Sequence, residues 1–390
     1  MIIKEKVREQ KFHYLYLAIF IFAVSDAIFA YAQSTFLNQY FSLQLVGLIF
    51  FSAYFLTFIV INRFPNLIAR YSNLKTAFAS IFLRIICLLV FIYSPNGYWL
   101  GATFILFIVS LILTFINLDI FLEAFTKNAT TGKVRGIYFT IYNLGWLVSP
   151  FLAGEILNYL NFQYLFLISL ILNLPLALIL YLKFRNAENH YAHQTFNISK
   201  TLAKILIQPD LRKIFTLSFL LQFFYAVEVV YIPIYLIQNI GLNWEQIGII
   251  FTIMLIPFVL IQYPAGYLAD KYFGEKEMLF IGLVLMGVTA IIMGFINTPD
   301  LLVWSLVLFI SRIGASLFEI MRETYFFKKV DVDNIDIINA FRSTIPLAYL
   351  VAPALAITII YYSQINYLFV AMGIILLLGL WPTLTLKDTK

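Results

Sequence analysis

Long apolar runs separated by short polar segments fill most of this 390-residue chain. The runs extend over about 20 residues each, the length at which an α-helix crosses the hydrocarbon core of a bilayer. Strands of a membrane barrel are about half as long and alternate in polarity. The pattern therefore predicts twelve transmembrane helices, at residues 14–37, 42–62, 76–95, 98–122, 136–158, 163–183, 213–238, 245–265, 277–296, 301–321, 337–361 and 366–386.

The composition makes lipid the main solvent of the chain. Hydrophobic residues make up 62% of the sequence and charged residues only 12%, whereas about a quarter of a soluble domain is charged. In lipid every backbone polar group must be hydrogen-bonded within the protein, which leaves helices or closed barrels. Together with the length of the runs, this predicts an all-α polytopic membrane protein.

The placement of lysine and arginine predicts the orientation. Four arginines lie within or at the ends of predicted spans, and the other 22 of the 26 basic residues fall on alternate connections or at the termini. Because cytoplasmic segments of membrane proteins are rich in these residues, we expect both termini on the cytoplasmic side of the cell membrane. The net charge of +6 reflects this placement, so no nucleic-acid partner is expected.

An internal repeat divides the chain into two halves. A shift of 201 residues places Asn38 on Asn239 and Arg70 on Lys271, a shift of 200 places Asp119 on Glu319 and Glu123 on Glu323, and a shift of 203 places Pro150 on Pro353. We therefore expect a six-helix bundle at 1–183, a soluble cytoplasmic linker at 184–212 and a second six-helix bundle at 213–390. Two parallel six-helix repeats are typical of transporters that rock about a central site.

One connection carries a motif. Residues 266–276 read GYLADKYFGEK, and a partial copy at 65–75 keeps two basic residues, including Arg70, but has Ala69 in place of the acid. Glycine permits a tight turn, and basic residues suit cytoplasmic head groups. The loop resembles the signature of the major facilitator superfamily, a family of secondary transporters. The resemblance rests on Gly266, Asp270, Lys271 and Gly274.

The fifth predicted span carries small residues at regular spacing. They are Gly136, Gly145, Ser149, Pro150, Ala153 and Gly154. Small residues let helices approach closely, and a proline bends a helix. The spacing resembles the antiporter motif of the same superfamily, with two of its glycines replaced, and the resemblance implies export. A general helix–helix contact is the alternative interpretation.

Charged residues near the predicted cytoplasmic ends resemble the charge networks of the family. Glu123 is followed by Arg135 and Gly136, and the resemblance implies that Arg70, Glu123 and Arg135 form one cluster. It implies a second cluster of Lys271 and Glu323, with Arg322 as a further candidate. Pairing and unpairing of such clusters can bias a two-state equilibrium. The alternative is a set of positive-inside charges without a latching role.

Ionisable residues near the membrane midplane are costly and are functional candidates. Asp26, Glu228 and Arg312 lie about a dozen residues into their spans. In related drug antiporters an acid of span one faces an arginine of span four, which implies that Glu228 pairs with Arg312. Asp26 has no such cation, because Ile112 occupies the corresponding position. Asp26 is therefore expected to bind a proton or a cationic substrate, or else to hydrogen-bond a neighbouring helix.

Further polar residues lie within the spans. We expect Arg84 to pair with Asp119. Glu319 follows Arg312 by seven residues and shares its helical face, so it lines the pathway with Arg342 or belongs to the cytoplasmic network. Polar side chains on cavity-prone helices are candidate substrate contacts or packing residues. They are Tyr31, Gln33, Asn143, Gln222, Tyr231 and Tyr235.

The sequence argues against enzymatic chemistry. It contains one cysteine, Cys87, no glycine-rich phosphate loop with Lys-Ser/Thr, and no nucleophile–base or metal-ligand spacing. No cofactor and no metal is expected. The interpretation is a monomeric secondary transporter in the bilayer. It would move a small molecule by alternating access about a site between the halves. A proton gradient would drive transport, and export of hydrophobic or amphipathic compounds is favoured. Import of a sugar or peptide is the alternative, as is a non-transporting sensor or scaffold.

Overall fold

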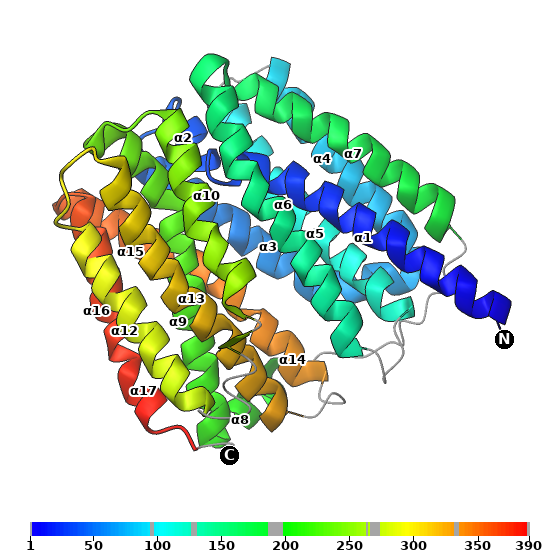
Figure 1. Cartoon of the computed structure of the whole chain (residues 1–390). Helices are drawn as coiled ribbons and strands as arrows, with labels where there is room; N and C mark the ends of the chain where they lie inside the picture. Colours follow the sequence, from blue (N-terminus) through cyan, green and yellow to red (C-terminus); the bar gives the residue numbers. More distant parts are fainter. Residues whose placement is uncertain are drawn as a thin grey trace. The chain divides into compact units, whose positions relative to one another are not determined.

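The computed structural model describes residues 2–93, 97–125, 131–185, 198–262, 264–265, 274–330 and 335–387. All regular structure within these ranges is helical (Figure 1). Contacts divide the chain into two units. Unit 1 comprises residues 1–40 and 52–194, and unit 2 comprises residues 41–51 and 195–390.

Unit 1 is built around one buried helix. Its elements are α1 (Ile2–Ala30), α2 (Gln33–Asn38), α3 (Leu43–Tyr71, whose first turns group with unit 2), α4 (Asn73–Tyr93), α5 (Gly97–Phe125), α6 (Thr131–Tyr159) and α7 (Phe162–Phe184). Helix α1 packs against α5, α6 and α7, and α4 packs against α5 and α7. In the apolar stretch Lys11–Asn38, 72% of an 18-residue hydrophobic segment is buried. Asp26, which lies in this stretch, is therefore held inside the bundle.

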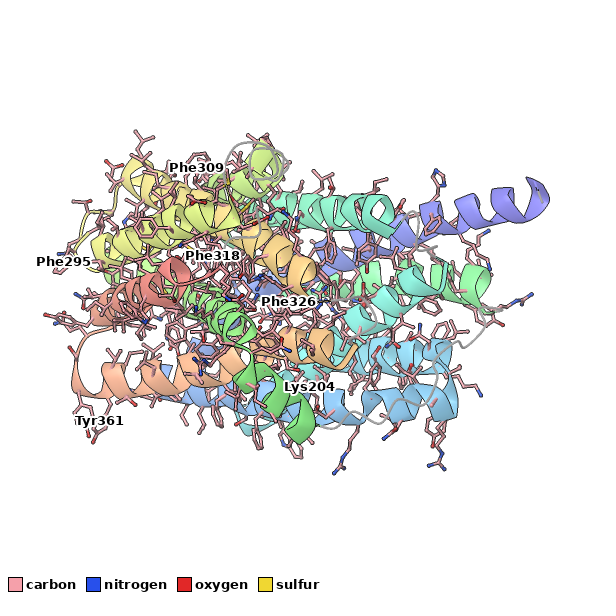
Figure 2. All side chains as sticks on the ribbon, turned by 90° about the horizontal axis from the view of Figure 1, so that it is seen from below. Lys204, Phe295, Phe309, Phe318, Phe326 and Tyr361 are labelled. Carbon is pink, nitrogen blue, oxygen red and sulfur yellow. The ribbon has the colours of Figure 1, made fainter. Side chains whose placement is uncertain are left out.

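Unit 2 has the same kind of buried helix. Its elements are α8 (Ile198–Ile207), α9 (Pro209–Tyr235), the π-helix η2 (Leu236–Ile240), α10 (Trp244–Leu260), α12 (Glu275–Met293), α13 (Leu301–Lys329), α14 (Ile335–Arg342), α15 (Thr344–Tyr362), α16 (Asn366–Leu378) and α17 (Leu380–Leu384). Helix α9 packs against α13, α15 and α16, and α12 against α13 and α16. Phe318 and Phe326 of α13 lie inside unit 2, whereas Phe295 and Tyr361 are exposed at its margin (Figure 2).

Each of the twelve predicted spans contains a helix. Within the described part of the chain, ten helices are long and apolar enough to cross a membrane. Helix α10 is a shorter apolar helix of 17 residues, and α6 has 29 residues. Several helices run past the predicted ends, as α3 does to Tyr71 and α13 to Lys329. Hydropathy falls where charged residues begin, but the backbone hydrogen bonds of a helix continue through them.

The segment 184–212, predicted to be a soluble linker, is helical in part of its described residues. Helix α8 occupies Ile198–Ile207, and α9 begins at Pro209. Ile198, Leu202 and Ile205 are spaced four and three residues apart, which gives the short helix an apolar stripe. Proline suits the first turn of a helix because its missing N–H would be unpaired there.

Candidate functional site

A salt bridge joins α9 to α13 in the interior of unit 2. Nη2 of Arg312 lies 2.6 Å from Oε2 of Glu228, and the two side chains are 2% and 1% exposed. The Oγ of Ser311 donates to Oε1 of Glu228 at 3.4 Å. The contact expected between these two residues is confirmed. Its role in transport stays a prediction.

Aromatic rings provide a second support for this buried arginine. The guanidinium carbon of Arg312 lies 5.1 Å from the ring centre of Phe224 and 5.5 Å from that of Tyr225. An aromatic face attracts a cation, more strongly where water is excluded. Helix α9 thus supplies both the carboxylate and the two rings that hold the charge of α13.

In unit 1 the structure corrects the expectation that Asp26 has no cation near it. Arg84 of α4 is completely buried and interacts electrostatically with Asp26, which is 4% exposed. The cation comes from the third predicted span, not from the fourth, where Ile112 stands. Among the described residues, Asp26 makes no direct ion pair or hydrogen bond. The two opposite charges attract each other, but no salt bridge joins Asp26 to Arg84.

Arg84 is held by the residue next to Asp26. Its Nη2 donates to the backbone oxygen of Ser25 at 3.1 Å and to the Ser25 Oγ at 3.3 Å. The guanidinium also lies 5.3 Å from the ring centre of Phe22 and 5.2 Å from that of Phe107. Helix α1 therefore presents a ring, a hydroxyl and a carboxylate to the same arginine.

Ser25 also joins α1 to α7 through a polar cluster that the sequence did not reveal. The Ser25 cluster consists of Ser25, Ser169 and Asn173, all fully buried. The Oγ atoms of Ser25 and Ser169 are 2.9 Å apart, Ser169 Oγ donates to the Ser25 carbonyl at 2.8 Å, and Asn173 Nδ2 donates to Ser25 Oγ at 2.9 Å. Hydrogen bonds of this kind fix helices against each other inside a membrane.

The predicted pair of Arg84 with Asp119 does not form. Two hydrogen bonds set the register of α4 on α5, Thr114 Oγ1 to Ser80 Oγ at 2.9 Å and Thr76 Oγ1 to Asn117 Oδ1 at 2.9 Å. In this antiparallel register Asp119 lies roughly nine residues, or about 14 Å along the axis, from the level of Arg84. Arg84 on α4 and Asp119 on α5 therefore lie at different levels along this helix pair.

The two buried acids occupy matching places in the repeat, whereas the two arginines do not. Glu228 follows Asp26 by 202 residues, inside the range of shifts that aligns the halves. The same shift places Arg84 on Met286 of α12, and it places Ser110 of α5 on Arg312. Met286 and Ser110 are both fully buried. Each unit therefore supplies the cation from a different helix.

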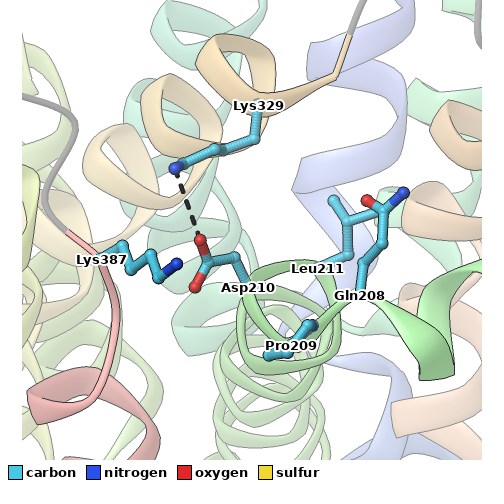
Figure 3. A pocket seen from close by; sticks show the side chains of 6 residues that line it. All are labelled: Gln208, Pro209, Asp210, Leu211, Lys329 and Lys387. Atoms are coloured by element: carbon cyan, nitrogen blue, oxygen red, sulfur yellow. Dashed lines mark ion pairs between the residues drawn. The ribbon is translucent and has the colours of Figure 1, made fainter.

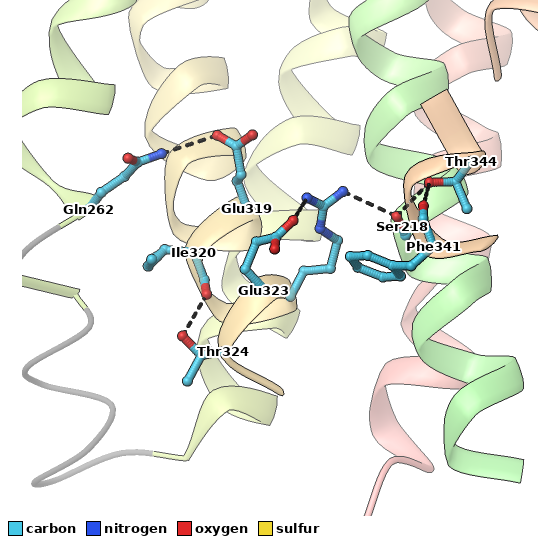
Figure 4. Close-up of polar contacts among 9 residues, drawn as sticks. Ser218, Gln262, Glu319, Ile320, Glu323, Thr324, Phe341 and Thr344 are labelled. Atoms are coloured by element: carbon cyan, nitrogen blue, oxygen red, sulfur yellow. Dashed lines mark hydrogen bonds and ion pairs between the residues drawn. The ribbon is translucent and has the colours of Figure 1, made fainter. Parts of the chain in front are cut away.

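Glu319, which was expected to line the pathway with Arg342 or to belong to the cytoplasmic network, lies further along α13. Nε2 of Gln262 donates to Oε2 of Glu319 at 3.1 Å (Figure 4). Arg342, which was expected to line a pathway with Glu319, is exposed at the end of α14. The acid is half-buried, and the side chain that hydrogen-bonds it is a neutral amide.

Arg322, four residues before Phe326, is part of a second network on α13. It pairs with Glu323, and its Nη1 donates to Ser218 Oγ at 3.1 Å. Ser218 and Thr344 are joined through their hydroxyl oxygens at 2.8 Å, and the guanidinium lies 5.1 Å from the ring centre of Phe341 (Figure 4). Glu323 was expected in a cluster with Lys271, with Arg322 as a further candidate. The structure shows the pair with Arg322, and Lys271 lies outside the described residues.

Several residues of the expected cytoplasmic networks fall outside the described part of the chain. Gly266, Asp270 and Lys271 lie outside the described residues. Glu123, Arg135 and Gly136 lie within helices, but their surroundings are outside the described part. Gly274 is described and precedes α12 as its N-cap. Arg70 is in the last turn of α3, 5.2 Å from the ring centre of Tyr71. The clustering of Arg70 with Glu123 and Arg135 stays a prediction.

The end of unit 2 at which α9 and α12 begin, here called the linker end, carries further ion pairs. Glu275, the first residue of α12, is 1% exposed and pairs with Lys328 at 2.5 Å. Asp210 pairs with Lys329 at 3.4 Å, beside a small open pocket (Figure 3). Glu275 was not singled out from the sequence, although it is part of the 266–276 loop.

The span-five motif acts in packing. A Cβ added to Gly145 would lie 2.7 Å from the Cβ of Ala23 and 3.2 Å from the backbone nitrogen of Val24. The glycine thus lets α6 approach α1 immediately before Asp26. Ser149 donates to the Gly145 carbonyl at 2.6 Å, and Pro150 lies inside the helix. Gly154, also part of the motif, is buried.

The six candidate substrate contacts lie in diverse settings. Tyr31 meets the ring of Trp146 at 6.0 Å, and Tyr235 donates its hydroxyl to the Ile296 carbonyl at 3.3 Å. Tyr231 is fully buried. Gln33 and Gln222 are buried and Asn143 is half-buried. Their contact with a substrate stays a prediction.

Comparisons with known proteins agree on the family. The model of the Major Facilitator Superfamily matches residues 15–246 and 214–390. The crystal structure of a bacterial homologue of the human lysosomal transporter Spinster, inward-facing and unoccupied, is similar in fold, with a TM-score of 0.72 and 11% identity over 97% of this chain and 96% of that one. A probable sulfoacetate transporter, SauU, from Cupriavidus necator is 32% identical over 66 residues, 17% of this chain. The matched segment spans 15% of that protein.

Proposed function

The chain belongs to the Major Facilitator Superfamily, so it is a secondary transporter of small molecules and not an enzyme, and we propose that protons drive it through Asp26. The observation that carries this proposal is the setting of Asp26. The carboxyl group is 4% exposed, faces Arg84 electrostatically, and has no direct ion pair among the described residues. A charge at such depth needs a partner or a function.

Proton binding at Asp26 would change the charge that surrounds Arg84. When Asp26 is ionised, the two charges compensate each other. When it takes up a proton, Arg84 keeps only its hydrogen bonds to Ser25 and its two rings. Because Arg84 belongs to α4 and Asp26 to α1, the proton alters the attraction between two helices of unit 1. A two-state transporter responds to any such difference in free energy between its states.

Export of a hydrophobic or amphipathic compound is the direction that we favour. The support is the span-five motif, because its resemblance to the antiporter motif implies export, and because Gly145 packs α6 onto α1 beside Asp26. We place both termini on the cytoplasmic side of the cell membrane, and we propose that the transporter acts as a monomer.

Uptake of a small nutrient is the second candidate. Sugars and peptides belong to this class, and one observation extends it to organic acids. Within the described residues, Nε and Nη1 of the buried Arg84 have no hydrogen-bond partner, and such donors suit a carboxylate or sulfonate. The short similarity to a probable sulfoacetate transporter points the same way.

An assay in proteoliposomes tests the proposal. Ethidium as a lipophilic cation and sulfoacetate as an organic anion would be the probes, with a pH gradient imposed in either direction. We expect one probe to move in response to the gradient in the wild type, and the direction distinguishes export from import. Asp26→Asn should abolish the response, and Asp26→Glu, which keeps a carboxyl group, should retain part of it. Wild-type coupling in Asp26→Asn would refute the role of Asp26.

A further inference from the structure

Glu228 and Glu319, two carboxylates of unit 2, differ in their partners. Glu228 is locked to Arg312 at 2.6 Å, and its side chain is 1% exposed. Glu319 is half-buried and receives a hydrogen bond from the neutral amide of Gln262 at 3.1 Å (Figure 4). A salt bridge to an arginine stabilises the ionised form of a carboxyl group. Protonation of a carboxylate that accepts a hydrogen bond from a neutral amide breaks no ion pair.

We propose that Glu319 is a second proton-binding group of the transporter and that it, rather than Glu228, takes up the proton in unit 2. This inference rests on the proposed proton coupling through Asp26 and extends it to a second site. The carboxylate would take a proton from water and become neutral, and it would return the same proton to water later in the cycle. Each unit would then contain one proton-binding acid.

The partner of Glu319 suits both protonation states. The side-chain amide of Gln262 has a donor and an acceptor. It donates to Oε2 in the structure, and after a rotation its oxygen could accept from the protonated acid. An arginine has no acceptor, so the environment of Glu228 offers no such alternative. The hydrogen bond to Gln262 can therefore persist through a cycle of protonation.

The cation nearest to Glu319 along α13 is already engaged. Arg322 pairs with Glu323, donates to Ser218 and lies over the ring of Phe341. The charges of Arg322 and Glu323 both act on Glu319, with opposite sign. Since that arginine is matched by its own carboxylate, it leaves little net positive charge to hold Glu319 ionised.

Among the described residues of the other helices around Glu319, no further cation acts on it. From α9 the phenol of Tyr225 faces the carboxyl group. Helix α12 packs on this part of α13 through Gly282, whose added Cβ would lie 2.9 Å from Phe318. The charged residues of α12 lie at its start, where Glu275 is paired with Lys328. Within the described part of the chain, the titratable groups that act on Glu319 are thus this phenol and the Arg322–Glu323 ion pair.

Glu319 is half-buried, whereas Glu228 is 2% exposed, and Glu319 lies close to a partly exposed side chain of α13. Glu323 follows it by one helical turn, and the Glu323 side chain is 26% exposed. Gln262 lies four residues before Gly266, where the loop motif begins. Arg312 lies two turns further into unit 2, about 10 Å away along the axis.

Infrared titration of the full-length protein in lipid would test the proposal without a substrate. The signal is the carbonyl stretch of protonated carboxyl groups, followed over pH and identified by its shift in heavy water. We expect Glu319→Gln to remove one titrating band and Asp26→Asn to remove another. Glu319→Asp should retain a shifted band. Glu277→Gln, which changes an exposed acid of α12, should leave both bands unchanged.

The outcomes separate this inference from the proposed function. An unchanged spectrum in correctly folded Glu319→Gln would overturn the second site. Loss of a band in Glu228→Gln but not in Glu319→Gln would overturn it as well and assign the proton to the salt bridge. If Asp26→Asn alone left the spectrum unchanged, the coupling through Asp26 would fail while the band of Glu319 remained. Gel filtration and helical circular dichroism of each variant would establish that it is folded.

Discussion

Arg84 Nη2 lies 3.1 Å from the backbone oxygen of Ser25, the residue immediately before Asp26. The arginine is therefore fixed to the helix that bears the acid, although it makes no direct ion pair with the acid itself. A substrate or proton that alters Asp26 changes the charge balance around Arg84 without first breaking a salt bridge. In unit 2 the corresponding acid, Glu228, is in direct contact with Arg312.

The first prediction concerns Arg84. Arg84→Met leaves Asp26 as a buried acid without compensating charge, and we expect a loss of about 3–5 kcal/mol of stability. The double variant Asp26→Asn/Arg84→Met should recover much of that loss, because it removes both charges. Thermal unfolding of the detergent-solubilised protein measures this. Equal losses in the single and double variants would show that the two charges are not coupled.

The second prediction concerns the orientation of the Glu228–Arg312 pair. Exchange of the two residues, as in Glu228→Arg/Arg312→Glu, keeps one charge of each sign. It also moves the guanidinium away from its place 5.1 Å from Phe224 and 5.5 Å from Tyr225 and sets a carboxylate there. We therefore expect the exchange to restore little of the stability that either single variant loses. Full recovery, measured by the same unfolding assay, would show that the rings contribute nothing.

The third prediction concerns the close approach of α6 to α1. Gly145→Ala adds a Cβ at 2.7 Å from that of Ala23, and overpacking of this kind costs about 1–3 kcal/mol. Ala23→Gly removes the Cβ with which the added methyl group would clash. The double variant Ala23→Gly/Gly145→Ala should therefore be more stable than Gly145→Ala. If Gly145→Ala alone matched the wild type in thermal unfolding, the glycine would not be needed for packing.

The fourth prediction concerns the linker end of unit 2. Lys328→Met leaves the buried carboxylate of Glu275 without its ion pair, and we expect a loss of about 1–3 kcal/mol. Lys329→Met is a matched control, because its partner Asp210 is 20% exposed and partly exposed pairs contribute at most about 1 kcal/mol. Chemical denaturation of the two variants side by side would compare them. A smaller loss for Lys328→Met than for Lys329→Met would contradict the account.

The fold could be predicted from hydropathy because membrane helices are set by long apolar runs. The ends of the helices could not, since helical hydrogen bonds continue beyond the apolar run, as at Lys329. Helix α8 was missed because its ten residues are too few to stand out among apolar runs of about 20 residues. Its apolar stripe becomes visible only once three- and four-residue spacing is considered.

The site could be predicted where depth in the membrane, the internal repeat and the resemblance to drug antiporters pointed to the same residues. Glu228 and Arg312 both lie deep in their spans, and the structure joins them. Arg84 was assigned to Asp119 because sequence gives its helix and depth but not the register of α4 on α5. That register is set by Ser80 with Thr114 and by Thr76 with Asn117. No spacing along one chain segment contains this information.

The most direct test of proton coupling through Asp26 compares exchange with gradient-driven transport in one variant. Asp26→Asn would be reconstituted in vesicles with whichever probe, ethidium or sulfoacetate, the wild type transports. We expect the variant to exchange labelled for unlabelled probe across the membrane at equal pH, but to show no accumulation when a pH gradient is imposed. Accumulation at the wild-type level in Asp26→Asn would contradict the account.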